Sequence, residues 1–356
     1  MDLVPADLPV LTTLRPRADA QAWLRRLPGL IAEVRDEFGL RLSAPLHGGS
    51  CSWVAPATTP DGTAVIVKIG WPHREMLGEP AALRRWNGRG AVRLIAHDPD
   101  RHALLLARCV PAVELGRSPR PAAERLQIGC AVLRRLWSAP ATDESEQPTD
   151  TATSVTDKSE QPTDVATKQA TLATDKFDQL ANVATKPATS VTDEFEQLAD
   201  VAAEWAGLAE ERMDRIRPGY DPGLVAEGVR LLRSLPADAE RTVLLHGDFN
   251  PGNILSDSDG WRAIDPKPLV GDPAYDPWPL LEQIDNPFSY ADPGAQLRER
   301  VALLAHSLGL PADRIVAWCL ARRVETALFA AQHGDVTGGA QLLAEARILA
   351  DLPGQL

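Results

Sequence analysis

The sequence lacks cysteine pairs, long apolar runs and a basic surplus, and each absence excludes a class of protein. The four cysteines are widely separated and form no C-x-x-C pair, so they do not indicate a disulfide framework. We expect them to be small core residues in a reducing compartment. They are Cys51, Cys109, Cys130 and Cys319. With 356 residues, the chain can bury a large core without such crosslinks.

The sequence also lacks a membrane or export signal. No apolar run approaches the roughly 20 residues that a membrane-spanning helix needs. The first residues have no basic start of a signal peptide, and Pro5 and Pro9 interrupt them. We therefore expect a cytoplasmic protein without a membrane partner.

The chain has no excess of basic residues, since 37 lysines and arginines stand against 49 acidic residues for a net charge of −12. A nucleic-acid binder normally needs a basic face, so we expect no nucleic-acid partner. The acidity is concentrated in residues 142–206, where 14 acidic residues and 4 lysines supply −10 of this charge. The net charge therefore gives no argument for a polycationic substrate.

Residues 142–191 form a repetitive acidic insertion. Four related units begin at Thr142, Thr156, Thr174 and Thr192. The first two units carry many serines and threonines but almost no large apolar residue, so they cannot bury enough surface to offset the entropy of ordering. We expect this insertion to be disordered or partly helical, and a partner-binding tail is the functional alternative.

The last unit differs, because its apolar residues follow three- and four-residue spacing. This spacing predicts an amphipathic helix with Thr192 at its N-cap. The apolar residues are Phe195, Leu198, Val201, Ala202, Trp205 and Leu208.

The remaining pattern predicts an α+β protein with two lobes, in line with a length that suggests about two domains. Residues 1–110 form the small lobe, and residues 111–356 form a larger, mainly helical lobe. In the small lobe we expect a leader helix bent at Pro28, one further helix and antiparallel strands. The helices span residues 18–38 and 75–86. The strands span residues 53–57, 64–69, 92–97 and 103–108. The large lobe contains one strand-and-loop block and three closing helices, at 243–264, 295–308, 312–333 and 339–352.

The strand-and-loop block carries the chemistry. It contains LLHGDFNPGNIL and then AIDPKP, in which Asn253 follows Asp248 by five residues and Asp265 follows Asn253 by twelve. Phosphoryl transfer needs an oriented hydroxyl and neutralised phosphate charge. Asp248 can accept or orient the acceptor hydroxyl, and Asn253 and Asp265 offer hard oxygen ligands for a Mg²⁺ ion that bridges ATP phosphates. The alternative is a pair of ordinary turns.

The spacing also matches the H-x-D-x-x-x-x-N catalytic loop of protein kinases, with Gly247 in place of arginine. We expect His246 to be structural rather than a base. Buried behind the loop, it would brace the backbone of Asp248.

Lys68 is the candidate phosphate-binding residue of the small lobe. It lies in the β-branched run VIVKI, where a lysine is unusual. In a kinase such a lysine contacts the α and β phosphates, and a glutamate on the next helix holds it. We choose Glu79 as this partner, with Glu75 in reserve. The alternative is an edge-strand lysine that points to water.

Two further stretches are candidates for nucleotide binding. Gly49 and Ser50 lie at the first hairpin, where backbone amides could cover phosphates, although a G-x-G-x-x-G pattern is missing. Cys109 and Val110 lie between the lobes, where the backbone could pair with adenine.

These residues resemble the aminoglycoside phosphotransferase family, which has a kinase-like fold. Within it, the chain is similar to the streptomycin 6-phosphotransferase and hydroxyurea phosphotransferase branch. The similarity covers about residues 40–140 and 192–340, and its main segments are GTAVIVKIGWPHREMLGEPAALRRWNGRGAVRL, HGDFNPGNIL and IDPKPLVGDPAYDP.

The resemblance implies Asp248 as the catalytic aspartate and Asn253 and Asp265 as magnesium ligands. It also implies that Lys68 and Glu79 position the phosphates of ATP. Lys267 stands where protein kinases have the glycine of D-F-G, so activation-loop switching is not carried over.

The resemblance implies O-phosphorylation of a small hydroxylated molecule. The first candidate acceptor is a streptomycin-type aminoglycoside, and the second is hydroxyurea. Alternatives are a kinase of another metabolite alcohol, or a binding protein that recruits a partner through its repeats. We expect a monomer or weak homodimer.

Aminoglycoside kinases bind their polycationic acceptor with carboxylates and aromatic rings. Candidates here are Asp272, Asp276, Trp278, Glu282, Asp285 and Glu325. The structural alternatives are that Asp272 and Asp276 cap helices or brace the loop, and that Trp278 belongs to the core.

Overall fold

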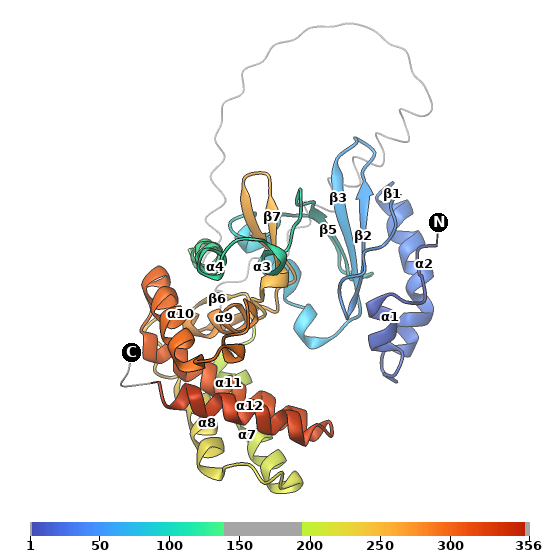
Figure 1. Ribbon diagram of the computed structural model, residues 1–356. Coiled ribbons are helices and arrows are strands. Elements are labelled where there is room, and N and C mark those ends of the chain that lie inside the picture. The colour runs from blue at the N-terminus through green and yellow to red at the C-terminus, as the bar shows by residue number, and fades with distance from the viewer. Residues whose placement is uncertain (1, 139–193, 353–356) are drawn as a thin grey trace, which may run out of the picture. The chain divides into compact units, whose positions relative to one another are not determined.

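The computed structural model describes residues 2–138 and 194–352, and within them the chain divides into two compact units (Figure 1). One unit comprises residues 2–88 and 92–108, and the other comprises residues 89–91, 109–138 and 194–352. The insertion predicted at 142–191 lies outside the described residues. No helix in the described part of the chain is both long enough and apolar enough to cross a membrane.

The first unit contains a five-stranded antiparallel sheet with the strand order β1-β2-β3-β5-β4. The strands are β1 (Arg41–Leu42), β2 (Ser52–Thr58), β3 (Ala64–Gly70), β4 (Leu94–Asp98) and β5 (Ala103–Ala107). The four predicted strands correspond to β2, β3, β4 and β5 to within two residues at each end, whereas β1 was not predicted. Strand β3 is central, because it pairs with β2 on one side and β5 on the other.

Helices α1 (Pro9–Leu14) and α2 (Gln21–Glu37) cover one face of this sheet, as Figure 1 shows. The predicted leader helix is confirmed, and α2 continues through Pro28. Alternate residues of β3 face this layer, since side chains of a strand alternate between the two faces of the sheet. The shared core includes Leu27, Ile31, Trp53, Val65, Val67, Ile69 and Leu105.

The helix predicted at 75–86 starts later than expected. A short 3-10 turn, η1 (Arg74–Met76), comes first, and the α-helix α3 spans Glu79–Trp86. The start was wrong because Pro80 lacks a backbone N–H group and is tolerated only in the first helical turn, which sets the helix start next to it.

The second unit is mainly helical, as predicted. Its helices are α4 (Ala122–Trp137), α7 (Leu198–Ile216), α8 (Pro222–Ser234), α9 (Pro277–Gln283), α10 (Pro293–Leu308), α11 (Ala312–Gln332) and α12 (Val336–Ala350). The three closing helices are confirmed. Helix α11 is the most buried of them and lies beside α12 in Figure 1.

The helix predicted from the last repeat is confirmed as α7, but its start and buried face differ. It begins at Leu198 with Gln197 at the N-cap, and Thr192 lies outside the described residues. Phe195 is buried ahead of the helix, whereas Trp205 is only half-buried. Leu198, Val201 and Ala202 are buried as predicted, and the unpredicted Ala206 and Ala209 complete the packed face.

Two hairpin-like pairs hold the predicted strand-and-loop block. Strand β6 (Val243–Leu245) pairs with β9 (Leu269–Gly271), and β7 (Ile254–Asp257) pairs with β8 (Gly260–Ala263). The chain from β6 to β7 and the chain from β8 to β9 are therefore fixed at both ends. These two connections contain the predicted catalytic and metal residues.

Candidate active site

The loop after β6 is held against the segment before β9 by its backbone. The amide of Lys267 donates a hydrogen bond to the carbonyl of His246 at 2.8 Å, which extends the β6–β9 pairing by one step. Gly247 follows with φ +79°, and a Cβ atom there would lie 1.8 Å from the carbonyl oxygen of Lys267. Only glycine fits, because both the positive φ and the contact exclude a side chain.

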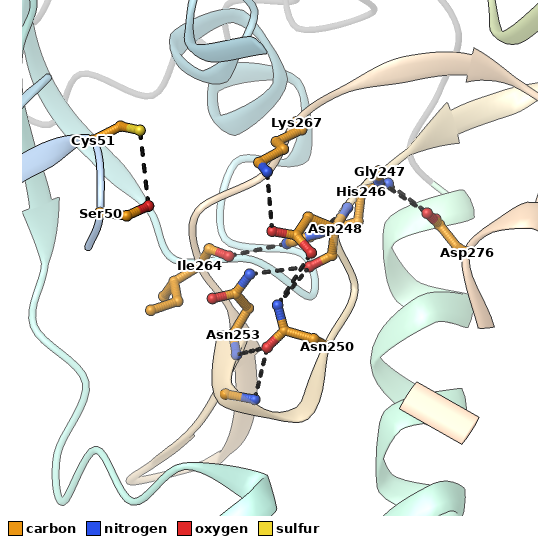
Figure 2. A network of polar contacts seen from close by, with 11 residues as sticks. Ser50, Cys51, His246, Gly247, Asp248, Asn250, Asn253, Ile264, Lys267 and Asp276 are labelled. Carbon is orange, nitrogen blue, oxygen red and sulfur yellow. Dashed lines mark hydrogen bonds and ion pairs between the residues drawn. The ribbon is translucent and has the colours of Figure 1, made fainter. Parts of the chain in front are cut away.

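Asn250 orders the loop that carries Asp248 (Figure 2). Its side-chain oxygen accepts hydrogen bonds from the amides of Gly252 and Asn253, which caps the 3-10 turn η3 (Pro251–Asn253). Its side-chain nitrogen donates to Oδ1 of Asp248 at 3.1 Å. Asn250 therefore fixes both the backbone of the loop and the Asp248 carboxylate.

A buried carboxylate, Asp276, braces the start of the same loop. It accepts hydrogen bonds from the amides of His246 and Gly247, both at 2.9 Å, and from Nε1 of Trp137 at 3.1 Å. Burial raises the pKa of Asp276, and the nearby His246 and the backbone donors act in the opposite direction. Because three donors point at it, we describe Asp276 as a carboxylate.

His246 lies behind the loop, as predicted. Nε2 lies 3.0 Å from the carbonyl oxygen of Ile264, and Nδ1 accepts a hydrogen bond of 3.4 Å from the Asp248 amide. This network assigns the proton to Nε2 of a neutral ring. Burial lowers the pKa of His246, in keeping with that assignment. The expected bracing of the Asp248 backbone is confirmed.

The β7–β8 hairpin brings Asn253 and Asp265 together at its open end. Asn253 precedes β7, Asp265 follows β8 by two residues, and the Ile264 amide donates to the Asn253 carbonyl at 2.9 Å. The Asn253 side-chain nitrogen donates to the Asp248 carbonyl at 3.0 Å, which reserves its oxygen for another partner. Asp265 has φ +57°, a strained conformation for a residue other than glycine.

This pair of donors fits magnesium. The described residues contain no cluster of three or more histidines, cysteines or acids that could hold a metal ion. A dedicated protein cage is therefore absent from that part of the chain. Mg²⁺ does not need one, because it is usually held by one or two side chains together with phosphate oxygens and water. The assignment of Asn253 and Asp265 as metal ligands stays a prediction.

In the first unit, Lys68 and Glu79 form a buried ion pair. Lys68 Nζ lies 2.7 Å and 2.6 Å from the two carboxylate oxygens of Glu79. The residues are only 7% and 1% exposed. Lys68 points away from the α1–α2 layer, since it alternates with Val67 and Ile69 on a central strand. The chosen pairing with Glu79 is confirmed, and the edge-strand alternative is wrong.

Removal of one partner of this pair should destabilise the protein strongly. In Lys68→Met, the Glu79 carboxylate stays buried without its counter-charge, which costs about 3–5 kcal/mol. Urea unfolding of the full chain measures this change. The variant Arg35→Met removes the exposed Arg35–Asp36 pair and should leave the midpoint unchanged. Equal midpoints for Lys68→Met and wild type would contradict the argument.

The other predicted nucleotide residues lie in loops. Gly49 and Ser50 are exposed in the connection between β1 and β2, and Gly49 has φ +86°. In the second unit, Cys109 is buried, which raises the pKa of its thiol to about 11. The amide of Val110 donates to Asp257 at 3.2 Å and so is already used. Their roles in nucleotide binding stay predictions.

Three of the predicted acceptor residues are buried in the second unit and have structural contacts. Asp272 caps the 3-10 turn η4 (Pro273–Tyr275) and binds Arg314 at 2.7 Å. Asp276 braces the loop, and Trp278 packs edge-on against Phe288. These contacts agree with the structural alternatives given for the three residues, in which Asp272 and Asp276 cap a turn or brace the loop and Trp278 belongs to the core.

The three remaining acceptor candidates form ion pairs with arginines. Glu282 lies 2.9 Å from Nη1 of Arg323, and Glu325 lies 2.8 Å from Nη1 of Arg212. Asp285 pairs with Arg125. Contact of any of the six with an acceptor stays a prediction, and each already has a partner within the chain.

One organising contact of the loop was missed from the sequence. Asn250 had a local signal, because an asparagine before Pro-Gly is a typical cap. The bracing of the loop by Asp276 was among the structural alternatives, but its two amide partners were not identified, since the segments are separated by about 30 residues of chain.

The chain has a kinase-like fold. The solved structure of a thermostable mutant (N202A) of aminoglycoside phosphotransferase APH(4)-Ia, in a ternary complex with AMP-PNP and hygromycin B, matches with a TM-score of 0.51. The match has 14% sequence identity and covers 91% of this chain and 98% of that chain.

The sequence defines the family more narrowly. The profile of the aminoglycoside/hydroxyurea antibiotic resistance kinases matches residues 42–198 and 194–334, and the chain belongs to this family. Hydroxyurea phosphotransferase of Kitasatospora aureofaciens is 30% identical over 97% of this chain and 85% of its own length. Streptomycin 6-kinase of Streptomyces glaucescens is 29% identical over 89% of this chain and 87% of its own length. The chain is therefore a phosphotransferase, and the resemblance stated from its residues is confirmed.

Proposed function

We propose that this protein transfers the γ-phosphoryl group of ATP to a hydroxyl group of a small antibiotic or drug. The observation that carries the proposal is the ordered loop in which Asp248 is held by Asn250 and lies next to Asn253. The names of the two relatives suggest hydroxyurea and a streptomycin-type aminocyclitol as acceptors. Because ATP is the donor and the cysteines are free thiols, we place the reaction in the cytoplasm.

Asp248 acts on the acceptor. Its carboxylate accepts a hydrogen bond from the acceptor hydroxyl and aims the oxygen at the phosphorus. As the new O–P bond forms, the hydroxyl proton passes to Asp248, and the bond to the β-phosphate oxygen breaks with its electron pair. Asn250 holds Oδ1 of Asp248, so the carboxylate does not have to be oriented during the reaction.

The remaining residues serve the nucleotide. Lys68 contacts the α and β phosphates, and Glu79 keeps the Lys68 ammonium in place. Asn253 and Asp265 would hold magnesium through their side-chain oxygens. When bound, magnesium neutralises the phosphate charge that spreads in the transition state.

The charges of the described carboxylates do not favour one of the two acceptors over the other. Streptomycin-type compounds are polycations and favour carboxylates without a partner, whereas hydroxyurea carries no charge. The predicted carboxylates of the second unit are all engaged by arginines or backbone amides. Both compounds therefore stand as equal candidates.

The proposal is tested by transfer of labelled phosphate from γ-labelled ATP with the purified full chain. We expect product with streptomycin or hydroxyurea, and none after chelation of divalent metal. Asp265→Asn should raise the magnesium concentration for half-maximal rate by about 10-fold, because a neutral ligand binds Mg²⁺ more weakly. Transfer only to sugars or amino alcohols would show that the acceptor is another metabolite alcohol and not an antibiotic or drug. No transfer to any alcohol would refute the proposal.

A further inference from the structure

Lys267 lies next to the candidate catalytic carboxylate. Its Nζ atom is 3.5 Å from Oδ2 of Asp248, while Asn250 Nδ2 binds the other oxygen, Oδ1, at 3.1 Å (Figure 2). The two oxygens of Asp248 are therefore held by different groups, one positive and one neutral. Each carboxylate oxygen can accept more than one hydrogen bond, so capacity remains for an acceptor hydroxyl.

The backbone of Lys267 is fixed independently of its side chain. The Lys267 amide binds the His246 carbonyl, and the Lys267 carbonyl packs against Gly247. Both contacts join Lys267 to residues one and two positions before Asp248. The ammonium group is thus attached to a backbone that is hydrogen-bonded to the loop that carries Asp248.

Stability does not explain this contact. The side chains of Lys267 and Asp248 are 43% and 31% exposed, and partly exposed ion pairs contribute about 0–1 kcal/mol to stability. Orientation is a stronger explanation. Rotation of a carboxylate about its last torsion angle has only broad minima, so a contact at each oxygen is needed to fix its plane.

We propose that Lys267 is a positioning residue that holds the carboxylate plane of Asp248 for the acceptor hydroxyl. This role rests on the proposed function, in which Asp248 accepts the hydroxyl proton. Lys267 itself takes no proton in the step. With one oxygen held by Asn250 and the other by Lys267, the remaining lone pairs point in fixed directions, and misplacement of a reacting group by about 1 Å can cost about 100-fold in rate.

The experiment compares Lys267→Met and Lys267→Arg with wild type. We expect Lys267→Met to lower kcat by about 10- to 100-fold, with the acceptor KM and the unfolding temperature unchanged. Lys267→Arg keeps the charge and should recover a large part of kcat. In an Asp248→Asn background, Lys267→Met should cause no further loss, because the two residues act as one unit. The proposal would be overturned if Lys267→Met left kcat unchanged, or if it lowered kcat by the same factor in the Asp248→Asn background as in wild type.

Two readouts do not depend on turnover. The affinity for Mg·AMP-PNP should stay within twofold in Lys267→Met but fall in Lys68→Met, the matched control for a phosphate ligand. A fall in both would make Lys267 a phosphate ligand instead. Crystal structures should show the Asp248 carboxylate rotated in Lys267→Met, and an unrotated carboxylate would contradict the role. If wild type transfers phosphate and Asp248→Asn does not, failure of these tests concerns Lys267 alone.

Discussion

Asp248→Asn should reduce phosphoryl transfer by about 10²- to 10⁴-fold, the range that general acid–base groups supply. The amide keeps the shape of the carboxylate but cannot take the acceptor proton. Because Asp248 is partly exposed and contacts Asn250 and Lys267 at the surface of the loop, we expect little change in unfolding temperature. Initial rates with labelled ATP measure the loss.

The control for this substitution is Asp259→Asn. Asp259 lies at the exposed turn of the β7–β8 hairpin, where it pairs with Arg262, and it should leave the rate unchanged. Turnover of Asp248→Asn equal to that of wild type would exclude Asp248 as the base. The same result would remove the basis of the role proposed for Lys267.

Asp276→Ala should destabilise the second unit by about 3–5 kcal/mol and abolish transfer. The substitution leaves the amides of His246 and Gly247 and Nε1 of Trp137 as buried donors without an acceptor. Each such donor costs about 1–3 kcal/mol. Urea unfolding and circular dichroism of the full chain measure the loss.

Trp137→Phe is the matched control, because it removes one of the three donors and leaves Asp276 in place. We expect a smaller loss of about 1 kcal/mol from the missing hydrogen bond and a measurable rate. If Asp276→Ala were as stable and active as wild type, the brace would have no role in holding the loop.

The local arrangement of the loop was predictable from the sequence. The spacing of Asp248, Asn253 and Asp265 carries it, and the strands on either side follow from short apolar runs. The pairing of Lys68 with Glu79 was also predictable, since a helix follows β3 with a glutamate in its first turn. These features depend on residues that are close along the chain or on a single hairpin.

The roles of the distant carboxylates were not predictable in the same way. Asp272 and Glu325 bind Arg314 and Arg212, which lie about 42 and 113 residues away. No spacing rule relates such pairs, because they depend on how α11 packs against α7 and η4. A carboxylate that follows Asp265, the predicted metal ligand, therefore looks the same in sequence whether it binds a substrate or an arginine.

The β7–β8 hairpin has a consequence for how the two metal candidates relate along the chain. Asn253 and Asp265 flank its open end, where the Ile264 amide donates a hydrogen bond to the Asn253 carbonyl. Their interval of twelve positions along the chain reflects the length of the hairpin and not the distance between the two side chains. A hairpin with one more or one fewer pair of residues would keep the same open end, so the interval can change in evolution while both residues stay at that end.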